Sequence, residues 1–404
     1  MKRPTDLIHH PYRAPSAFDA PQPGVHKAST VIFPNVASIA QRDWMNKSGY
    51  TYGLHGTPTT FTLEERLATL EGGTHCLLVP SGLAAIAHIN LALLSQGDEV
   101  LLPDNAYGPN KALAAHELSR WGISTQHYDP MSSADLAARL GPRTRLVWLE
   151  APGSVTMEFP DLIEMVRLCR DRGVMCALDN TWGAGLAFNA FDLLPDQTGS
   201  LGVDLTAHAL TKYPSGGGDV LMGSIVTRRD DIAQALKFTH MRLGTGVGAN
   251  DVELVLRSLP SIELRYRAQD IAARELAQWC ATQPAVAQVL HPALPGSPGH
   301  EQWQRVCVSA AEPQGLAAGI FSIVLDARWS TQHVHAFCDD LQLFKLGYSW
   351  GGPISLVMTY QLDAIRRLGT PHLCPGHVVR LCIGLEDVAD LREDLRQSMA
   401  RHLA

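Results

Sequence analysis

The stretch HCLLVPSGLAAIAHINLALLSQGDEVLLPDN, residues 75–105, contains two kinds of segment in alternation. A short apolar run at 75–80 is followed by a helical pattern that begins at Ser81, and a second strand-like run covers 98–105. Strands that are apolar throughout and alternate with amphipathic helices indicate βαβ units on a mostly parallel sheet covered on both faces. The stretch therefore predicts an α/β fold.

The chain that follows residue 105 extends this prediction. Strand-like and helical runs continue to alternate through TRLVWLEAPG, DLIEMVRLCRDRG and VMCALDN, and long helical patterns occupy about 230–280. The tail mixes strands with helices, which is typical of a smaller α+β domain. We expect an N-terminal arm at 1–60, an α/β domain at 61–250 and a C-terminal α+β domain at 251–404.

Composition excludes several classes of protein. The 404 residues are 46% hydrophobic and 18% charged, and the net charge of −7 argues against a general binder of nucleic acid or anionic membranes. The start lacks the apolar core of a signal peptide, and no run of apolar residues is long enough for a membrane span. None of the eight cysteines forms a CxxC pair. We expect a cytoplasmic protein with free thiols.

Several predicted strands end in small or polar residues, and open α/β sheets bind ligands at the carboxyl ends of their strands. Lys212, in HALTKYPSGGGDV at 208–220, lies where an apolar run meets a glycine loop. It could be an ordinary surface lysine, or a buried amine that forms a Schiff base with a carbonyl cofactor.

Four further features occur at neighbouring strand ends. Asp179 could pair with a pyridinium nitrogen, Ser81-Gly82 at a helix start could bind a phosphate, and Tyr107 could stack on a ring. Thr211 could also donate to a phosphate. Each residue alone has an ordinary explanation as a cap, a turn or a packing residue. Together with Lys212 they match one cofactor, pyridoxal 5′-phosphate (PLP).

Other cofactors lack their sequence patterns. No GxGxxG follows the first predicted strand, and no GxxxxGK[ST] is present, so neither a dinucleotide nor a P-loop site is predicted. The 17 histidines include no HExxH, so no catalytic metal is expected.

From about residue 25 to the C-terminus, the chain resembles the Cys/Met-metabolism PLP-dependent enzymes of fold type I, and among them the cystathionine β-lyases. The motifs that carry the resemblance are YGLHGTPT, LEGG, PSGLAA, NAYGPN, LEAPGSVTME, LDNTW, LTKY, HPALPGSPGHEQW, YSWGG and RLCIGLEDVADL. It implies a mostly parallel seven-stranded sheet flanked by helices, an N-terminal arm and a smaller C-terminal domain.

The resemblance also assigns roles to individual positions. Lys212 would hold PLP covalently and act as acid and base, Asp179 would pair with the ring nitrogen, and Tyr107 would stack on the ring. The phosphate would be bound by Ser81, Gly82, Leu83 and Thr211, and by Tyr52 of a neighbouring subunit. The substrate would be bound by Arg380, Ser349, Trp350 and Tyr107.

The implied activity is α,β-elimination of cystathionine to homocysteine, pyruvate and ammonia by a homotetramer, a dimer of dimers with shared active sites. Trp350, in SWGG where relatives acting at Cγ tend to read SLGG, favours β- over γ-elimination. The alternatives are a cystathionine or methionine γ-lyase, a γ-synthase, and a lyase for cystine or other S-substituted cysteines. A PLP-fold protein without activity is a further alternative.

Three positions depart from the family pattern. Leu54, followed by His55, stands where an arginine usually binds phosphate, and Ala209 replaces a serine. We expect both to affect cofactor affinity. Ile354 replaces a glutamate common in relatives, and we expect it to affect the substrate pocket.

Overall fold

The computed structural model describes residues 2, 5, 12, 20–195 and 200–404. A seven-stranded sheet has the order β1-β7-β6-β5-β4-β2-β3, in which β2 to β6 run parallel and β7 is antiparallel to both neighbours. The mostly parallel sheet predicted from the sequence is therefore confirmed. Its strands are β1 His75–Val79, β2 Glu99–Pro103, β3 Ser124–Tyr128, β4 Thr144–Glu150, β5 Met175–Asp179, β6 Leu205–Ala209 and β7 Gly223–Thr227.

Helices cover both faces of this sheet. In β4, Leu146 and Trp148 belong to a hydrophobic cluster with α4 and α8, whereas Val147 and Leu149 pack with α3, α6 and α7. Neighbouring side chains of a strand point to opposite faces of the sheet. A strand that is apolar throughout is therefore buried on both faces. The helices around this sheet are α3 Pro58–Glu71, α4 Gly82–Leu93, α5 Gly108–Leu113, α6 Ser133–Arg139, α7 Leu162–Asp171 and α8 Asp230–Leu243.

Local signals fix the start of the helices that lie closest to the site. Ser81 caps α4, and its hydroxyl accepts the Ala84 N–H at 3.0 Å. Thr57 and Thr60 form a reciprocal capping box at the start of α3. Caps of this kind satisfy N–H groups that have no partner within the helix.

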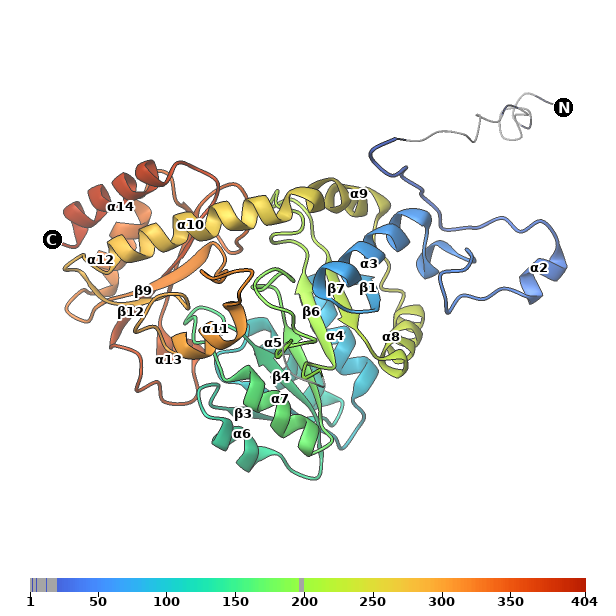
Figure 1. Ribbon diagram of the computed structural model, residues 1–404, viewed down its shortest axis with the longest axis horizontal. Helices are drawn as coiled ribbons and strands as arrows, with labels where there is room; N and C mark the ends of the chain where they lie inside the picture. The colour runs from blue at the N-terminus through green and yellow to red at the C-terminus, as the bar shows by residue number, and fades with distance from the viewer. Residues whose placement is uncertain (1, 3–4, 6–11, 13–19, 196–199) are drawn as a thin grey trace.

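The C-terminal part forms a second sheet of five strands in the order β10-β11-β12-β9-β8. One face packs on α10, α12 and α14, and the other joins the hydrophobic cluster of the large sheet. Figure 1 shows this part beside the large sheet, with α10 running along the top. Its elements are α9 Ala249–Ser258, α10 Ile262–Cys280, β8 Val286–Leu290, α11 His300–Cys307, β9 Ile320–Asp326, α12 Thr331–Asp339, β10 Lys345–Leu346, β11 Leu356–Tyr360, α13 Leu362–Ile365, β12 Gly376–Cys382 and α14 Val388–His402.

The described part of the N-terminal arm extends away from this body (Figure 1). It contains the short helix α2 Val36–Ala40, none of whose residues is buried, and a 3₁₀ turn at Gly53–His55. Residues 1, 3–4, 6–11 and 13–19 of the arm lie outside the described ranges. Within those ranges no helix is both long and apolar enough to cross a membrane. All eight cysteines are free, as expected.

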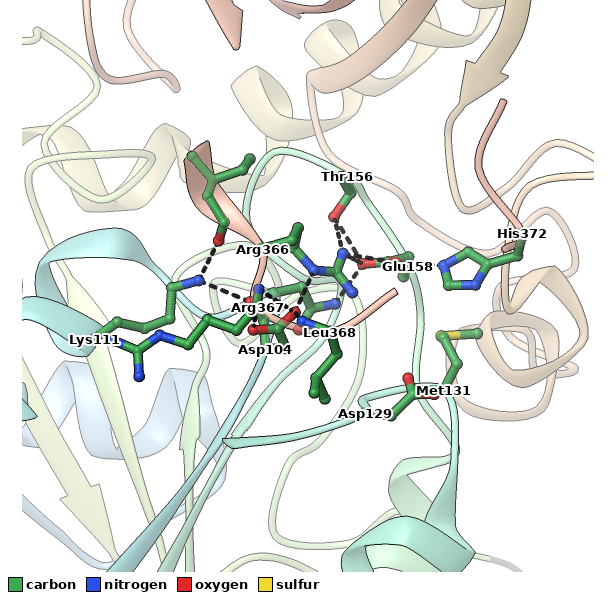
Figure 2. Close-up of polar contacts among 12 residues, drawn as sticks. Asp104, Lys111, Asp129, Met131, Thr156, Glu158, Arg366, Arg367, Leu368 and His372 are labelled. Carbon is green, nitrogen blue, oxygen red and sulfur yellow. Dashed lines mark hydrogen bonds and ion pairs between the residues drawn. The ribbon is translucent and has the colours of Figure 1, made fainter. Parts of the chain in front are cut away.

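A buried set of charges ties the C-terminal part to the large sheet; we call it the clasp, made of Asp104, Glu158 and Arg366. Arg366 Nε lies 3.0 Å from Asp104 Oδ2, and Arg366 Nη1 lies 2.9 Å from Glu158 Oε1 (Figure 2). His372 Nε2 and Thr156 Oγ1 also contact the Glu158 carboxylate. Asp104 follows β2 and Arg366 follows α13, so the clasp joins segments far apart in sequence.

The clasp makes stability depend on pH. Burial alone would raise the pKa of Glu158, but the hydrogen bond from His372 and the Arg366 charge lower it from 4.5 to about 2. A depressed carboxyl pKa adds stability above the unfolded value, and this is lost as the pH falls from about 4.5 toward 2. We expect Glu158→Gln to cost about 3 kcal/mol of unfolding free energy at pH 7, and the difference from wild type to narrow below about pH 4.5.

Denaturant unfolding across this pH range measures the effect. Glu393→Gln is the matched control, because Glu393 is also paired with an arginine, Arg396 at 2.7 Å, but is exposed. Solvent screens such a pair, so we expect little change. This account would be contradicted if Glu158→Gln lowered the free energy of unfolding equally at pH 7 and pH 3.

Candidate active site

Two neighbouring cavities that share part of their lining lie at the carboxyl ends of the parallel strands. We call them the inner cavity, of about 170 Å³, and the outer cavity, of about 730 Å³. Both cavities are lined by Tyr107, Ser154, Val155, Lys212, Trp350 and Arg380. The sequence predicted the candidate site residues at this same edge of the sheet.

Lys212 follows β6 and its amine lies between the two sheets. The Nζ atom donates to Ser349 Oγ at 2.7 Å and lies 4.5 Å from the centre of the Trp350 ring. Burial, and then the positive charge of Arg380, lower the Lys212 pKa from 10.5 to about 8. This amine is therefore easier to deprotonate than that of an ordinary lysine.

Arg380 reaches the same cavities from the second sheet. Its neighbours Val379 and Leu381 in β12 face α10, α12 and α14, while Val378 and Cys382 face the large sheet. The two-residue period of a strand directs Arg380 toward the large sheet with Val378 and Cys382. Arg380 is 4% exposed, its Nε has no hydrogen-bond partner in the described part of the chain, and its guanidinium stands 5.5 Å from Trp350 and 5.2 Å from Tyr360.

Asp179, at the end of β5, lines the inner cavity. Its Oδ1 accepts the Thr181 N–H at 3.1 Å. Burial raises the pKa of this carboxyl, although its bonds to Thr181 act in the opposite direction. An acid so placed is favoured as an anion when a cation lies against it.

The start of α4 forms another wall of the inner cavity through Ser81, Gly82 and Leu83. No hydrogen-bond acceptor in the described residues is assigned to the N–H groups of Gly82 and Leu83. A Cβ on Gly82 would lie 2.5 Å from the Cβ of Ala209, so only glycine fits there. Thr211 lines the same cavity. Free N–H groups at a helix start form a site for an anion.

The remaining predicted site residues are Tyr107, Ser349 and Tyr52, and they differ in which cavity they line. Tyr107 lines both cavities, and Ser349 lines the outer one. Ser349 has a φ of 114°, an unusual value for a residue other than glycine. Tyr52 is 46% exposed and lines neither cavity of its own chain. The structure thus brings together all the predicted site residues except Tyr52.

The three positions that depart from the family pattern lie in different parts of the structure. Ala209 lines the inner cavity, whereas Leu54 and His55 line a separate pocket near the arm. His55 Nδ1 lies 2.8 Å from Thr51 Oγ1, and burial lowers the pKa of His55. Ile354 is 57% exposed and lies outside both cavities.

Sequence reasoning missed Glu150, which lies beside Asp179 at the ends of adjacent strands. Glu150 Oε2 accepts the backbone N–H of Tyr107 at 2.8 Å, which holds that ring at the cavity. Burial, and then the negative charge of Asp179, raise the pKa of Glu150 well above its usual value. The signal was present, since TRLVWLE ends in an acid just as VMCALD does.

Comparison with known proteins gives this site a family. Residues 4–400 match the model of the family described as Cys/Met metabolism PLP-dependent enzyme. The chain belongs to this family. It is 36% identical over 384 residues to the cystathionine beta-lyase MetC of Escherichia coli K12, covering 93% of each chain. It is also 36% identical over 378 residues to the cystathionine beta-lyase of Bordetella avium, covering 93% of this chain and 91% of that one.

The fold and the range of relatives agree with this membership. The crystal structure of metB from Corynebacterium glutamicum superposes with a TM-score of 0.82 at 25% identity, covering 98% of this chain and 97% of that one. A cystathionine gamma-synthase of Mycobacterium bovis is 31% identical over 403 residues, covering 98% of this chain and 96% of that one. The fold type I prediction is confirmed, and the cofactor of this PLP-dependent family is PLP.

The residues present fit that cofactor. The inner cavity combines unpaired N–H groups at the α4 start, a buried carboxylate at Asp179 and the amine of Lys212. These groups complement a phosphate, a pyridinium nitrogen and an aldehyde carbon, respectively. Among the residues described, no three His, Cys, Asp or Glu side chains are placed to bind a metal ion.

Proposed function

We propose that this chain is a carbon–sulfur lyase of the cystathionine β-lyase type. It would convert L-cystathionine and one water to homocysteine, pyruvate and ammonia. The observation that carries the proposal is the Lys212 amine, which lies in a cavity lined also by Arg380 and Asp179 and close enough to feel the charge of both. The names of the relatives in Escherichia coli and Bordetella avium support it.

The cofactor would be held at four points. Lys212 would bind it covalently, Asp179 would pair with its ring nitrogen, and Tyr107 would stack on its ring. Its phosphate would lie against Ser81, Gly82, Leu83 and Thr211, with Tyr52 of a second subunit completing the cradle. Bound PLP supplies an electron-withdrawing ring that stabilises negative charge developing at the substrate Cα.

The chain's own groups would then bind the substrate and move its protons. Arg380 would bind the substrate α-carboxylate with its planar guanidinium, which suits a bidentate contact. Lys212, with a pKa lowered to about 8, would accept the proton from Cα and donate a proton to the departing sulfur. Ser349 orients the Lys212 amine through its hydroxyl, and Trp350 forms the wall beside it.

Product analysis with cystathionine separates this proposal from its rivals. β-Elimination yields homocysteine and pyruvate, whereas γ-elimination yields cysteine and 2-oxobutyrate. We expect homocysteine and pyruvate in equal amounts, because the Trp350 ring, 4.5 Å from the Lys212 amine, narrows the pocket beside it. Cysteine and 2-oxobutyrate as the main products would reject β-elimination, and no turnover of cystathionine, cystine or methionine would reject the enzyme itself.

We also propose an oligomeric state, domain boundaries and a metabolic role. The chain would form a homotetramer, a dimer of dimers, and the exposed arm and the position of Tyr52 outside its own cavities suit a dimer in which Tyr52 serves the neighbouring site. The arm would end near residue 60 and the C-terminal domain would begin near 251. A lyase that releases homocysteine would serve methionine biosynthesis in the cytoplasm.

A further inference from the structure

The wall of the outer cavity carries an excess of positive charge. Its described lining contains no aspartate or glutamate. The cationic residues in this lining are Lys111, Lys212, Arg366, Arg367 and Arg380. The chain as a whole has a net charge of −7, so this local excess runs against the average. A cavity lined by one sign of charge attracts ligands of the opposite sign.

The clasp fixes the backbone that presents one of these cations, Arg367. The Asp104 carboxylate accepts the backbone N–H of Arg367 at 3.0 Å and that of Leu368 at 2.9 Å (Figure 2). It also accepts Arg366 Nε at 3.0 Å, and Asp104 is fully buried. The turn after α13 is therefore anchored by a carboxylate that the solvent does not reach.

The charge of Arg366 is balanced by Asp104 and Glu158, but that of Arg367 is not balanced. Arg367 is exposed, and in the described part of the chain its guanidinium has no ion-pair partner. Its side chain runs beside Lys111 in Figure 2.

Lys111 carries the same sign of charge as Arg367, and its amine bonds to backbone carbonyls rather than to a carboxylate. The Lys111 amine donates to the carbonyl oxygens of Asp104, at 2.8 Å, and Ile365. Burial lowers the pKa of Lys111, and the charges of Arg366 and Arg367 lower it further against the opposing effect of Asp104. Two adjacent cations thus face the outer cavity without a carboxylate of their own.

We propose that Arg367, supported by Lys111, binds a second carboxylate at the far end of the substrate, while Arg380 binds the carboxylate beside the reacting carbon. The substrate class is then S-substituted cysteines with a carboxylate on the departing half, rather than neutral S-alkyl cysteines. This inference rests on the proposed function for its first carboxylate. It adds a specificity-determining residue that neither touches the reacting atoms nor holds the cofactor.

A pair of ligands that cannot undergo elimination tests the proposal by binding alone. 2-Aminosuberate carries a carboxylate at the end of its chain, and 2-aminooctanoate carries a methyl group at the same position. We expect Arg367→Gln to weaken binding of 2-aminosuberate to the cofactor-loaded enzyme by about 5- to 10-fold in calorimetry. Binding of 2-aminooctanoate should change by less than about twofold, because it offers no charge to Arg367.

Two further variants make this test specific. Arg367→Lys keeps the charge and should retain most of the preference for 2-aminosuberate. Arg120→Gln removes another exposed arginine that lines neither cavity, and should leave both affinities unchanged. Equal weakening of the two ligands by Arg367→Gln, or no change in either, would overturn the proposal.

Kinetics give an independent measurement. With cystathionine, Arg367→Gln should raise KM by about 5- to 10-fold and leave kcat unchanged. With S-propylcysteine neither constant should move, and a fall in kcat for both substrates would point instead to a structural role. If wild type cleaves neither substrate, the proposed function fails, yet the ligand pair still decides whether Arg367 binds the second carboxylate.

Discussion

Lys212→Ala should lower kcat for cystathionine by at least about 10³-fold and abolish the absorption band that arises from the covalent link between the cofactor and a lysine amine. The loss in rate follows because Lys212 would serve as both base and acid, and positioned proton transfer alone is worth about 10² to 10⁴. The loss of this band follows because alanine has no amine to bind the cofactor covalently. Absorption spectra and initial rates on purified protein measure the two effects.

The control for this variant is Lys345→Ala. Lys345 is exposed and lines neither cavity, so both the band and the rate should remain. Circular dichroism would show whether Lys212→Ala still folds. A folded Lys212→Ala protein that keeps this band and its rate would remove Lys212 from the mechanism.

Arg380→Ala should raise KM for cystathionine by about 10²-fold or more, with a much smaller effect on cofactor affinity. Arg380 is 4% exposed and its Nε has no partner in the described residues, so a substrate carboxylate would complete its bonding. Removing one partner of a buried, hydrogen-bonded charge pair costs about 2–5 kcal/mol. Steady-state kinetics and cofactor titration measure the two quantities separately.

Arg380→Lys separates charge from geometry. A lysine keeps the charge but loses the planar fork that binds both carboxylate oxygens, so we expect a KM between those of wild type and Arg380→Ala. Substrate and cofactor binding that fell by the same factor in Arg380→Ala would reassign this arginine to the cofactor.

Much of the large sheet and its ligand edge could be predicted from local sequence. Apolar runs such as HCLLV and TRLVWLE fix strands that are buried on both faces, and the helical patterns between them impose parallel crossovers. The polar residues after these runs, Asp179 and Tyr107 among them, then meet at one edge. Glu150 also ends a strand at this edge, but it was not predicted as a site residue, because an acid at a strand end is often an ordinary turn residue.

Contacts between segments far apart in the chain could not be predicted from local sequence patterns. Nothing near Arg366 in the sequence indicates that it reaches Asp104 and Glu158, which precede it by 262 and 208 residues. Ile354 was expected to affect the substrate pocket, yet it is 57% exposed outside both cavities. Such outcomes depend on how the second sheet packs against the first.

The sequence by itself determined the fold class, the family and the set of residues at the strand ends, because periodicity and motifs are local properties. The tertiary structure alone decided that Arg380 faces Lys212 from another sheet and that burial and charge lower the Lys212 pKa to about 8. It also decided that Arg367 keeps an unbalanced charge at the outer cavity. Burial and electrostatic fields are sums over neighbours that lie close in space but far apart in the chain.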